Sequence, residues 1–305
     1  YYGDNLELAF GDVMPAFSEL TASNIGIFGF HPSVQLGFLS TTLVAGRSVT
    51  AKEGTDTTVG TFPRYMYGVD EKINLPFNSA VGVSYVRSED VAGITKLGPI
   101  GTALPLGKNS VLGTNLTLGF LRFFTLSCDY AQSRYKDEQS MFTELIDAAY
   151  SIAGEGNLFK KSVILRLKYL NTGKNFYSLS SPSIVRDRET VEAGTQLKFP
   201  WRLGNFAVDF KRYRDNLSKV ADKLAMVQTI FTGGTLISIP SLPSLNINGS
   251  FNSAVDQNIN NRMVNNYTLV YGAGIAHPVS SRFSYNFRGQ NSEFHDLKLK
   301  GNNRD

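Results

Sequence analysis

The sequence predicts an all-β protein: an antiparallel transmembrane β-barrel of roughly 12–16 strands, with long loops on one side and a short loop helix. The first observation behind this prediction is strict alternation of apolar and polar residues, seen most clearly in Leu245–Phe251 and Phe124–Tyr130. Successive side chains of a strand point to opposite faces, so each such segment has one apolar and one polar face. The second observation is that the pattern recurs along nearly the whole chain, and closure into a barrel would remove the sheet's unpaired edges.

The expected strands follow one another with turn-forming residues between them. In chain order they are Leu6–Phe10, Asn24–Phe30, Val34–Arg47, Arg64–Leu75, Ser79–Arg87, Val111–Leu121, Phe123–Tyr135, Ser162–Leu170, Val191–Phe199, Asn205–Tyr213, Thr235–Ile239, Leu245–Phe251, Met263–Ala276, Arg282–Gln290 and Asp296–Lys300. Some connections are tight, whereas others are long: Gly11–Ser23, Thr50–Pro63, Glu89–Lys108, Lys136–Lys161 and Asn171–Thr190. Such a mixture of short turns and long polar loops is the asymmetry expected between the two sides of an outer-membrane barrel.

One long connection has the spacing of an amphipathic helix. Its apolar residues recur every three or four positions at Phe142, Leu145, Ile146, Ala149 and Ile152. This spacing predicts a helix that packs on the barrel rim or that acts as a plug or docking element. A second segment, Lys219–Phe231, fits either a helix or a strand.

Composition narrows the class of protein. The 305 residues fit a single β-barrel domain spanning 1–305, or a piece of a larger barrel or assembly. The 21 Phe and 14 Tyr suit strands and membrane interfaces. No apolar run approaches the roughly 18–20 residues that a membrane helix needs, which excludes a helical membrane protein. The formal charge of +4 is spread along the chain, so we expect no nucleic-acid partner.

Recognisable catalytic and metal-binding motifs are absent from the sequence. The single cysteine, Cys128, lies in a strand with alternating apolar and polar residues, so we expect it to be a small apolar residue of the core or of the lipid-facing side. The three histidines, His31, His277 and His295, lack the spacing of metal ligands. We therefore expect no enzyme activity, no catalytic residue, no cofactor and no metal.

Charged residues inside otherwise regular strands are the candidate functional residues. A charge on the lipid face near the bilayer midplane costs about 2–4 kcal/mol, so these side chains should face a lumen or lie near the interface. The predicted pore-lining residues are Arg166, Lys168, Arg288, Asp129 and Asp209.

Short landmarks distributed along the chain resemble a group of large outer-membrane β-barrel proteins of Gram-negative bacteria. The landmarks are Gly11–Asp12, Phe17–Leu20, Ile25–Gly29, Val44–Arg47, Glu53–Thr55, Phe62–Arg64, Tyr67–Gly68, Val111–Thr114, Tyr177–Leu179, Arg186–Arg188, Arg214–Leu217 and Leu242–Leu245. The resemblance implies a membrane barrel and transfers no functional residue. The terminal residues Gly301–Asp305 depart from the aromatic ending of ordinary barrels, so we expect either that the final strand lies elsewhere in the parent protein or that this chain is a piece of a larger assembly.

Together these observations lead us to expect a porin-like passive or gated pore for small polar solutes in the outer membrane. The alternative is a structural or partner-docking barrel within a larger envelope complex. The expected partners are outer-membrane lipid and, for the alternative, other subunits of that complex.

Overall fold

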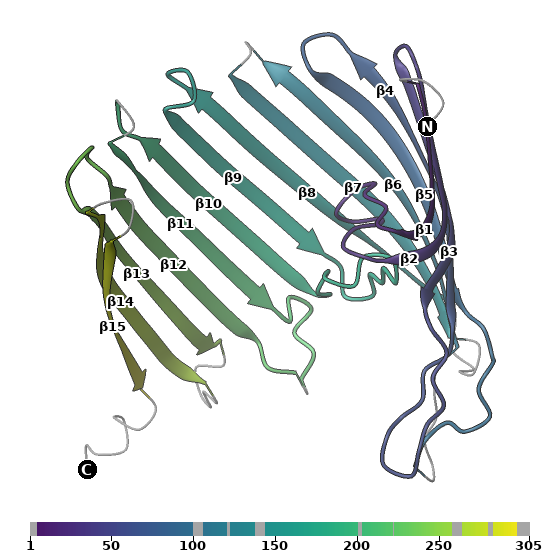
Figure 1. Ribbon diagram of the computed structural model, residues 1–305. Helices are drawn as coiled ribbons and strands as arrows, with labels where there is room; N and C mark the ends of the chain where they lie inside the picture. The colour runs from purple at the N-terminus through teal and green to yellow at the C-terminus, as the bar shows by residue number, and fades with distance from the viewer. Residues whose placement is uncertain are drawn as a thin grey trace, which may run out of the picture. The chain divides into compact units, whose positions relative to one another are not determined.

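In the part of the chain that the structure describes, fifteen antiparallel strands in one continuous order form the fold (Figure 1). The computed structural model describes residues 5–99, 106–120, 123–137, 144–200, 203–221, 223–257, 264–279 and 283–297. Hydrogen-bonded neighbours follow sequence order from β1 to β15. The strands are β1 (Leu6–Val13), β2 (Ile27–Leu36), β3 (Leu39–Val49), β4 (Arg64–Leu75), β5 (Ser79–Asp90), β6 (Gly107–Phe120), β7 (Phe124–Asp137), β8 (Leu145–Leu158), β9 (Val163–Thr172), β10 (Arg188–Lys198), β11 (Gly204–Asp215), β12 (Met226–Ile237), β13 (Ser244–Asp256), β14 (Asn265–Pro278) and β15 (Ser284–Asp296).

The strand count and the antiparallel order confirm the predicted all-β fold class. Each strand follows its hydrogen-bonded neighbour directly in sequence, which is the up-and-down arrangement. Most strands have 10 to 14 residues, and a strand that crosses a bilayer at a tilt needs about 9–11. No helix in the part of the chain that the structure describes is long and apolar enough to span a membrane.

Short and long connections alternate along the chain, which fits the predicted mixture of the two, but the predicted long link Lys136–Lys161 is wrong because it contains β8. Connections of two to six residues follow the even-numbered strands, for example Pro76–Asn78 between β4 and β5. Phe77 and Asn78 in this turn have φ values of 60° and 58°, in the left-handed region that tight turns require. The longer connections follow odd-numbered strands, so within each part of the sheet they gather at one end of the strands, called here the long-loop end.

Two long-loop connections hold each other together. The segments 50–63 and 91–99 are joined by backbone hydrogen bonds from Gly54 N to Lys96 O, 2.8 Å, and from Gly60 N to Leu97 O, 2.9 Å. The Glu53 carboxylate accepts hydrogen bonds from the backbone N–H groups of Lys96, 2.7 Å, and Thr95, 3.1 Å. These N–H donors, that of Lys96 first, lower the pKa of Glu53 from its ordinary value.

The predicted helix at Phe142–Ile152 is wrong. Leu145–Leu158 is strand β8, and Phe142 lies outside the described residues. Burial along β8 has the period of a strand: Ala149 and Ser151 are buried, whereas Ile146, Tyr150 and Ile152 are exposed. The helical spacing arose because both faces of β8 carry apolar residues: Leu145 and Ala149 alternate with Ile146 and Ile152. The undecided segment Lys219–Phe231 ends in a strand, since β12 begins at Met226.

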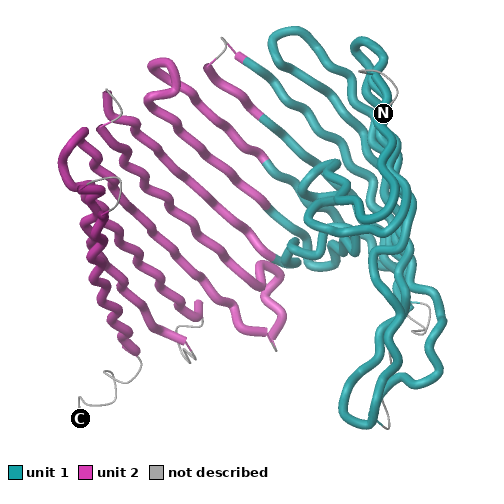
Figure 2. The backbone as a smooth tube through the Cα atoms, in the orientation of Figure 1, with its two compact units in different colours: residues 1–119, 127–151, 171–187 teal, residues 120–126, 152–170, 188–305 magenta. Residues whose placement is uncertain are grey.

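The chain divides into two compact units, shown in Figure 2. Unit 1 comprises Tyr1–Gly119, Ser127–Ser151 and Asn171–Asp187, and unit 2 comprises Phe120–Leu126, Ile152–Leu170 and Arg188–Asp305. The prediction of a single domain stays a prediction, and each unit is described below by itself.

Candidate functional site

In unit 1 the two faces of the sheet differ sharply. Directly paired residues of antiparallel strands share a face, so the register assigns each side chain to one of them. One face, called here the apolar face, carries the row Leu43, Val69, Tyr85 and Leu112. Leu43, Tyr85 and Leu112 are 42–49% exposed although nothing polar surrounds them in that row. Glu71 also lies on this face, where its carboxylate accepts a hydrogen bond from Thr41 Oγ1 at 2.7 Å.

The opposite face of unit 1 is covered by a segment of the chain itself. Between β1 and β2, residues 14–26 fold back over the strands (Figure 1). Leu20 and Ala22 are fully buried, and Phe17 and Ile25 are each 8% exposed. The segment holds its shape through backbone hydrogen bonds, including Phe17 N to Ala22 O at 3.0 Å. We call residues 14–26 the first covering segment and this face of unit 1 the covered face.

Two glycines on the covered face leave room for the first covering segment. A Cβ at Gly68 of β4 would lie 2.8 Å from the Phe17 ring, and a Cβ at Gly113 of β6 would collide with the methyl group of Thr21. Ser84 of β5, paired with Gly113, donates a hydrogen bond to Thr21 Oγ1 at 3.3 Å. Small side chains on these strands therefore permit contact between the segment and the sheet.

Residues 173–187, between β9 and β10, form a second covering segment that binds the first. Ser180 Oγ and Ser178 Oγ donate hydrogen bonds to the carbonyl oxygen of Thr21. Ser23 N donates to Ser180 O at 3.2 Å, and the hydroxyls of Ser23 and Ser181 lie 2.8 Å apart. The two segments are therefore joined by hydroxyl groups and backbone atoms, with no ion pair among these contacts.

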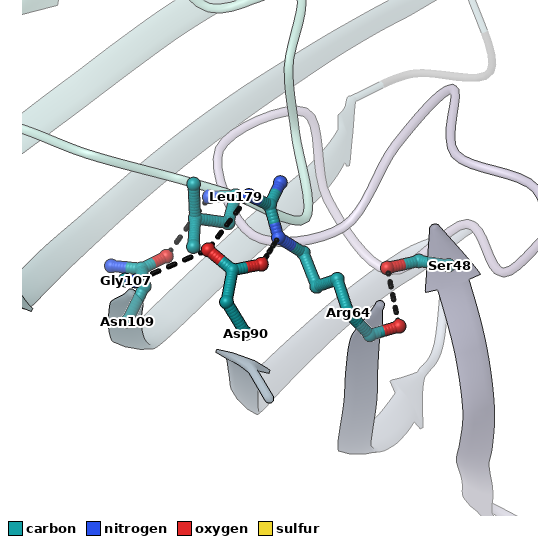
Figure 3. A network of polar contacts seen from close by, with 6 residues as sticks. All are labelled: Ser48, Arg64, Asp90, Gly107, Asn109 and Leu179. Atoms are coloured by element: carbon teal, nitrogen blue, oxygen red, sulfur yellow. Dashed lines mark hydrogen bonds and ion pairs between the residues drawn. The ribbon is translucent and has the colours of Figure 1, made fainter. Parts of the chain in front are cut away.

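Asn109 of β6 anchors the second covering segment to the sheet (Figure 3). Its Oδ1 accepts a hydrogen bond from Leu179 N at 2.9 Å, and its Nδ2 donates to the carbonyls of Tyr177, 3.0 Å, and Arg134, 3.1 Å. Ser133 Oγ accepts a further bond from Tyr177 N at 3.0 Å. Asn109 is 3% exposed and Ser133 is fully buried, so these bonds replace contacts with water.

Aromatic and charged groups extend this anchor. The Tyr177 ring stacks on Tyr135 of β7 with 4.2 Å between centroids, and the Arg186 guanidinium lies 3.9 Å from the Tyr177 centroid. A bidentate ion pair joins Arg64 of β4 to Asp90 of β5, with Nε to Oδ1 at 2.8 Å. Figure 3 shows that Asp90 also accepts a hydrogen bond from Gly107 N, at 3.1 Å.

In unit 2 one face carries charged residues arranged as pairs across strands; we call it the charged face. Lys211 Nζ lies 2.6 Å from Glu192 Oε1, and Arg188 Nε lies 2.5 Å from Asp215 Oδ1. These pairs join β10 to β11, whose register places both pairs on the same face. On the other face, Phe210, Phe231, Phe251 and Leu269 are successive cross-strand neighbours. Unit 2 therefore also has an apolar face and a polar face.

The predicted pore-lining residues of unit 2 lie on or beside its charged face. Asp209 of β11 pairs with Gly194 on the face that carries Lys211, and its Oδ1 lies 3.8 Å from Arg166 of β9. Lys168 is two residues from Arg166 on the same strand, so it shares that face. Arg288 of β15 is paired with Gly274 of β14. The next residue of β14, Ile275, lies on the apolar face, so Gly274 and Arg288 lie on the opposite, charged face.

In unit 1, Asp129 lies on β7 in alternation with Cys128 and Tyr130. Tyr130 is exposed, and the next residue on the side of Asp129, Ala131, is fully buried. Asp129 therefore shares the covered face. Pore lining by all five residues stays a prediction, and among them the structure brings together Arg166 and Asp209.

The covering segments are the main feature that sequence reasoning missed. Both were expected only as long loops, because folding back onto a strand face depends on residues far away in the chain. The small hydroxyl residues Ser178, Ser180 and Ser181 bind Thr21 and Ser23, but nothing in the sequence alone links the two groups. In the described part of the chain, no group of three or more His, Cys, Asp or Glu side chains is placed to bind a metal ion.

Comparisons with known proteins gave two solved structures. One is the outer membrane protein OprD from Pseudomonas aeruginosa, at 12% identity and a TM-score of 0.49, and the other is a doubly substituted form of OccD1 (OprD), at 13% identity and the same TM-score. Each alignment covers 93% of this chain and 75% of the other. No protein-family model matches the chain, and no curated protein matches it.

Proposed function

We propose that this chain forms a membrane-spanning β-barrel of the outer membrane and that its polar faces line a porin-like pore for small polar solutes. The observation that carries the proposal is the contrast between the two faces of each unit. One face exposes large apolar side chains such as Tyr85 and Leu112, and the other carries charges or covering segments.

Lipid explains the exposed apolar face. Leu167 is 65% exposed, and Phe10 and Phe287, on the apolar faces of β1 and β15, are 82% and 70% exposed. Burying an apolar surface gains about 25 cal/mol per Å², so such faces in water would be a large liability. Backbone groups in lipid must all be paired, and a closed antiparallel sheet achieves this.

The polar faces supply a route for solutes. On the charged face of unit 2, Arg166, Lys168 and Lys211 alternate with the carboxylates Glu192 and Asp209. Barrels well beyond eight strands leave lumenal space that side chains do not fill. The covering segments occupy part of that space beside the strands of unit 1, which would narrow the passage. We therefore expect a restricted pore that favours anions slightly.

Planar-bilayer recording of the purified protein tests the proposal. We expect stable unitary conductance, and a larger conductance after Gly173–Asp187 is shortened by replacing Asn175–Ile184 with a short Gly-Ser linker. A matched control variant would replace Thr55–Val59 with a linker of the same type. These residues lie in the loop 50–63, which binds the loop 91–99, so this variant should conduct as the unmodified protein does. A folded, heat-modifiable protein without any conductance would contradict the pore.

A structural or partner-docking barrel is the second candidate. It is favoured by the near-complete burial of Leu20, Thr21, Phe176 and Ser180 in the covering segments, since a tightly packed interior could block passage. Silence in the bilayer before and after the loop replacement, together with subunits that co-purify, would support this candidate.

A further inference from the structure

We propose that the apolar face of unit 1 contains a specific site for an anionic lipid, with the acyl chain in a groove between β2 and β5 and the headgroup phosphate at Arg47 and Arg87. The inference rests on the proposed membrane-spanning barrel. It assigns a ligand to the outside of that barrel rather than to its pore.

The groove runs along the apolar face toward the long-loop end. Its volume is about 650 Å³, within the range of about 300–1,000 Å³ usual for ligand sites. Its walls are apolar over most of their length and include Phe30, Leu43, Ala45, Tyr67 and Tyr85. Such a channel suits a hydrocarbon chain and offers little to a polar solute.

Charged residues close the groove at one end. Arg87 and Glu89 are part of its lining, and Arg87 Nη2 lies 3.0 Å from Glu89 Oε2. The register explains the position: Leu43 and Tyr85 lie in one row, Tyr67 and Arg87 in the next, and Arg47 and Glu89 in the third. An amphiphile bound along this line would therefore place its chain on the apolar rows and its head on the arginines.

The rim at the long-loop end of this face carries an excess of positive charge. Arg134 and Lys136 of β7 alternate with Ser133 and Tyr135, which contact the second covering segment, so both cations share the apolar face. Register also places Lys108 and Asp12 in the row of Arg47. Among the described residues of β1 to β7, this rim holds the cations Arg47, Arg87, Lys108, Arg134 and Lys136 and the carboxylates Asp12 and Glu89.

The opposite end of the same face has a different character. The row there contains Leu39, Ile73, Val81 and Leu116, and the adjoining turn carries Phe77, which is 85% exposed. Aromatic side chains are common at a membrane interface, but they do not select a charged head. Positive charge beside the groove is thus confined to one rim, and this charge asymmetry indicates a phosphate-bearing lipid.

Arginine is suited to this headgroup. Its planar guanidinium binds phosphate oxygens through two parallel hydrogen bonds, which are stronger where lipid excludes water. Arg87 has a side chain that is 53% exposed, and Arg47 is exposed as well, so both guanidinium groups are accessible from the membrane side. Glu89 holds Arg87 close to the groove without covering it.

Lipid binding to the delipidated full chain in detergent tests the site. The probes are dioleoyl phosphatidic acid and dioleoyl phosphatidylcholine, which share acyl chains and differ in headgroup charge, with binding counted by native mass spectrometry. We expect phosphatidic acid to bind at least about tenfold more tightly, since a charged hydrogen bond contributes about 1.5–3 kcal/mol. Inorganic phosphate in excess should compete weakly, because it lacks a chain to fill the groove.

Two variants and one control locate the site. Arg47→Gln with Arg87→Gln should abolish the preference for phosphatidic acid, and Ala45→Trp should remove one bound lipid by filling the groove. The control, Lys160→Gln with Lys161→Gln, removes the same charge from the short β8–β9 turn and should bind as the unmodified protein does. Equal affinity for both lipids, or unchanged binding by either variant, would overturn the site. Absence of conductance in the unmodified protein would contradict the proposed pore, but it would leave the proposed lipid site untouched.

Discussion

Removal of the Asn109 side chain should release the second covering segment from the sheet. Asn109→Ala deletes three hydrogen bonds, to Leu179 N and to the carbonyls of Tyr177 and Arg134, at a position that is 3% exposed. Two of these bonds, those to Leu179 and Tyr177, reach the segment, and the third joins β6 to β7. At about 1 kcal/mol for each bond, the segment loses about 2 kcal/mol of its attachment. A loss of this size corresponds to about a thirtyfold change in the equilibrium between the attached and released segment.

Hydrogen–deuterium exchange of the detergent-solubilised protein measures this change. The amides of Tyr177 and Leu179 should exchange about thirtyfold faster in Asn109→Ala, while amides of β4 and β5 stay protected. In the pore, open-channel conductance should rise as well. The matched control is Asn115→Ala, which removes an asparagine from the same face of β6, opposite Gly82. Unchanged exchange at Leu179, or an equal effect of Asn115→Ala, would refute the anchoring role of Asn109.

Three further predictions concern the charges, the loop pair and the first covering segment. Replacing Arg166, Lys168 and Arg288 by Glu should move the reversal potential under a salt gradient toward cation selectivity, and a folded variant with an unchanged potential would remove these residues from the pore lining. Acidification should loosen the pair of loops, 50–63 and 91–99, that Glu53 joins. Because the pKa of Glu53 is lowered in the folded protein, its stabilisation is complete above the ordinary value of 4.5 and is lost as pH falls through the folded pKa. Proteolysis of residues 50–63 should therefore increase over that pH range, whereas Glu53→Gln should be cleaved equally at both ends of the range. Gly113→Val should displace Thr21, so a cysteine introduced by Ser23→Cys should react faster with a water-soluble thiol label than it does in the protein that keeps Gly113. Equal labelling of the two proteins would contradict the close contact between Gly113 and Thr21.

Much of the fold was predictable because a strand in a two-faced sheet requires a period of two. That period located β4 to β7 and β9 to β11 within a few residues, whereas the expected strand Val34–Arg47 ran across the turn between β2 and β3. The ion pair between Arg166 and Asp209 shows that these two predicted residues lie on one side of the sheet. It failed at β8, where Leu145 and Ile146 put apolar side chains on both faces and imitated the spacing of a helix.

The covering segments could not be predicted from local pattern. Whether residues 14–26 extend outward or fold back depends on the absence of a side chain at Gly68 and Gly113 and on hydroxyls supplied more than 150 residues later. Each of these residues looks ordinary in sequence, since Gly and Ser are common in turns and strands alike. Their pairing becomes visible once the register fixes which strand residues share a face. The same is true of the groove beside Arg87, whose walls come from four strands.

A scan of spin labels along β9 tests most directly the claim that one face meets lipid and the other meets water. In a Cys128→Ser background, single cysteines at Leu165, Leu167 and Tyr169 would report the apolar face, and those at Arg166 and Lys168 the charged face. In proteoliposomes we expect the first set to be relaxed by oxygen, which concentrates in lipid, and the second by a water-soluble nickel complex, giving accessibility with a period of two. Equal access of the nickel complex to both sets would contradict the membrane-spanning barrel.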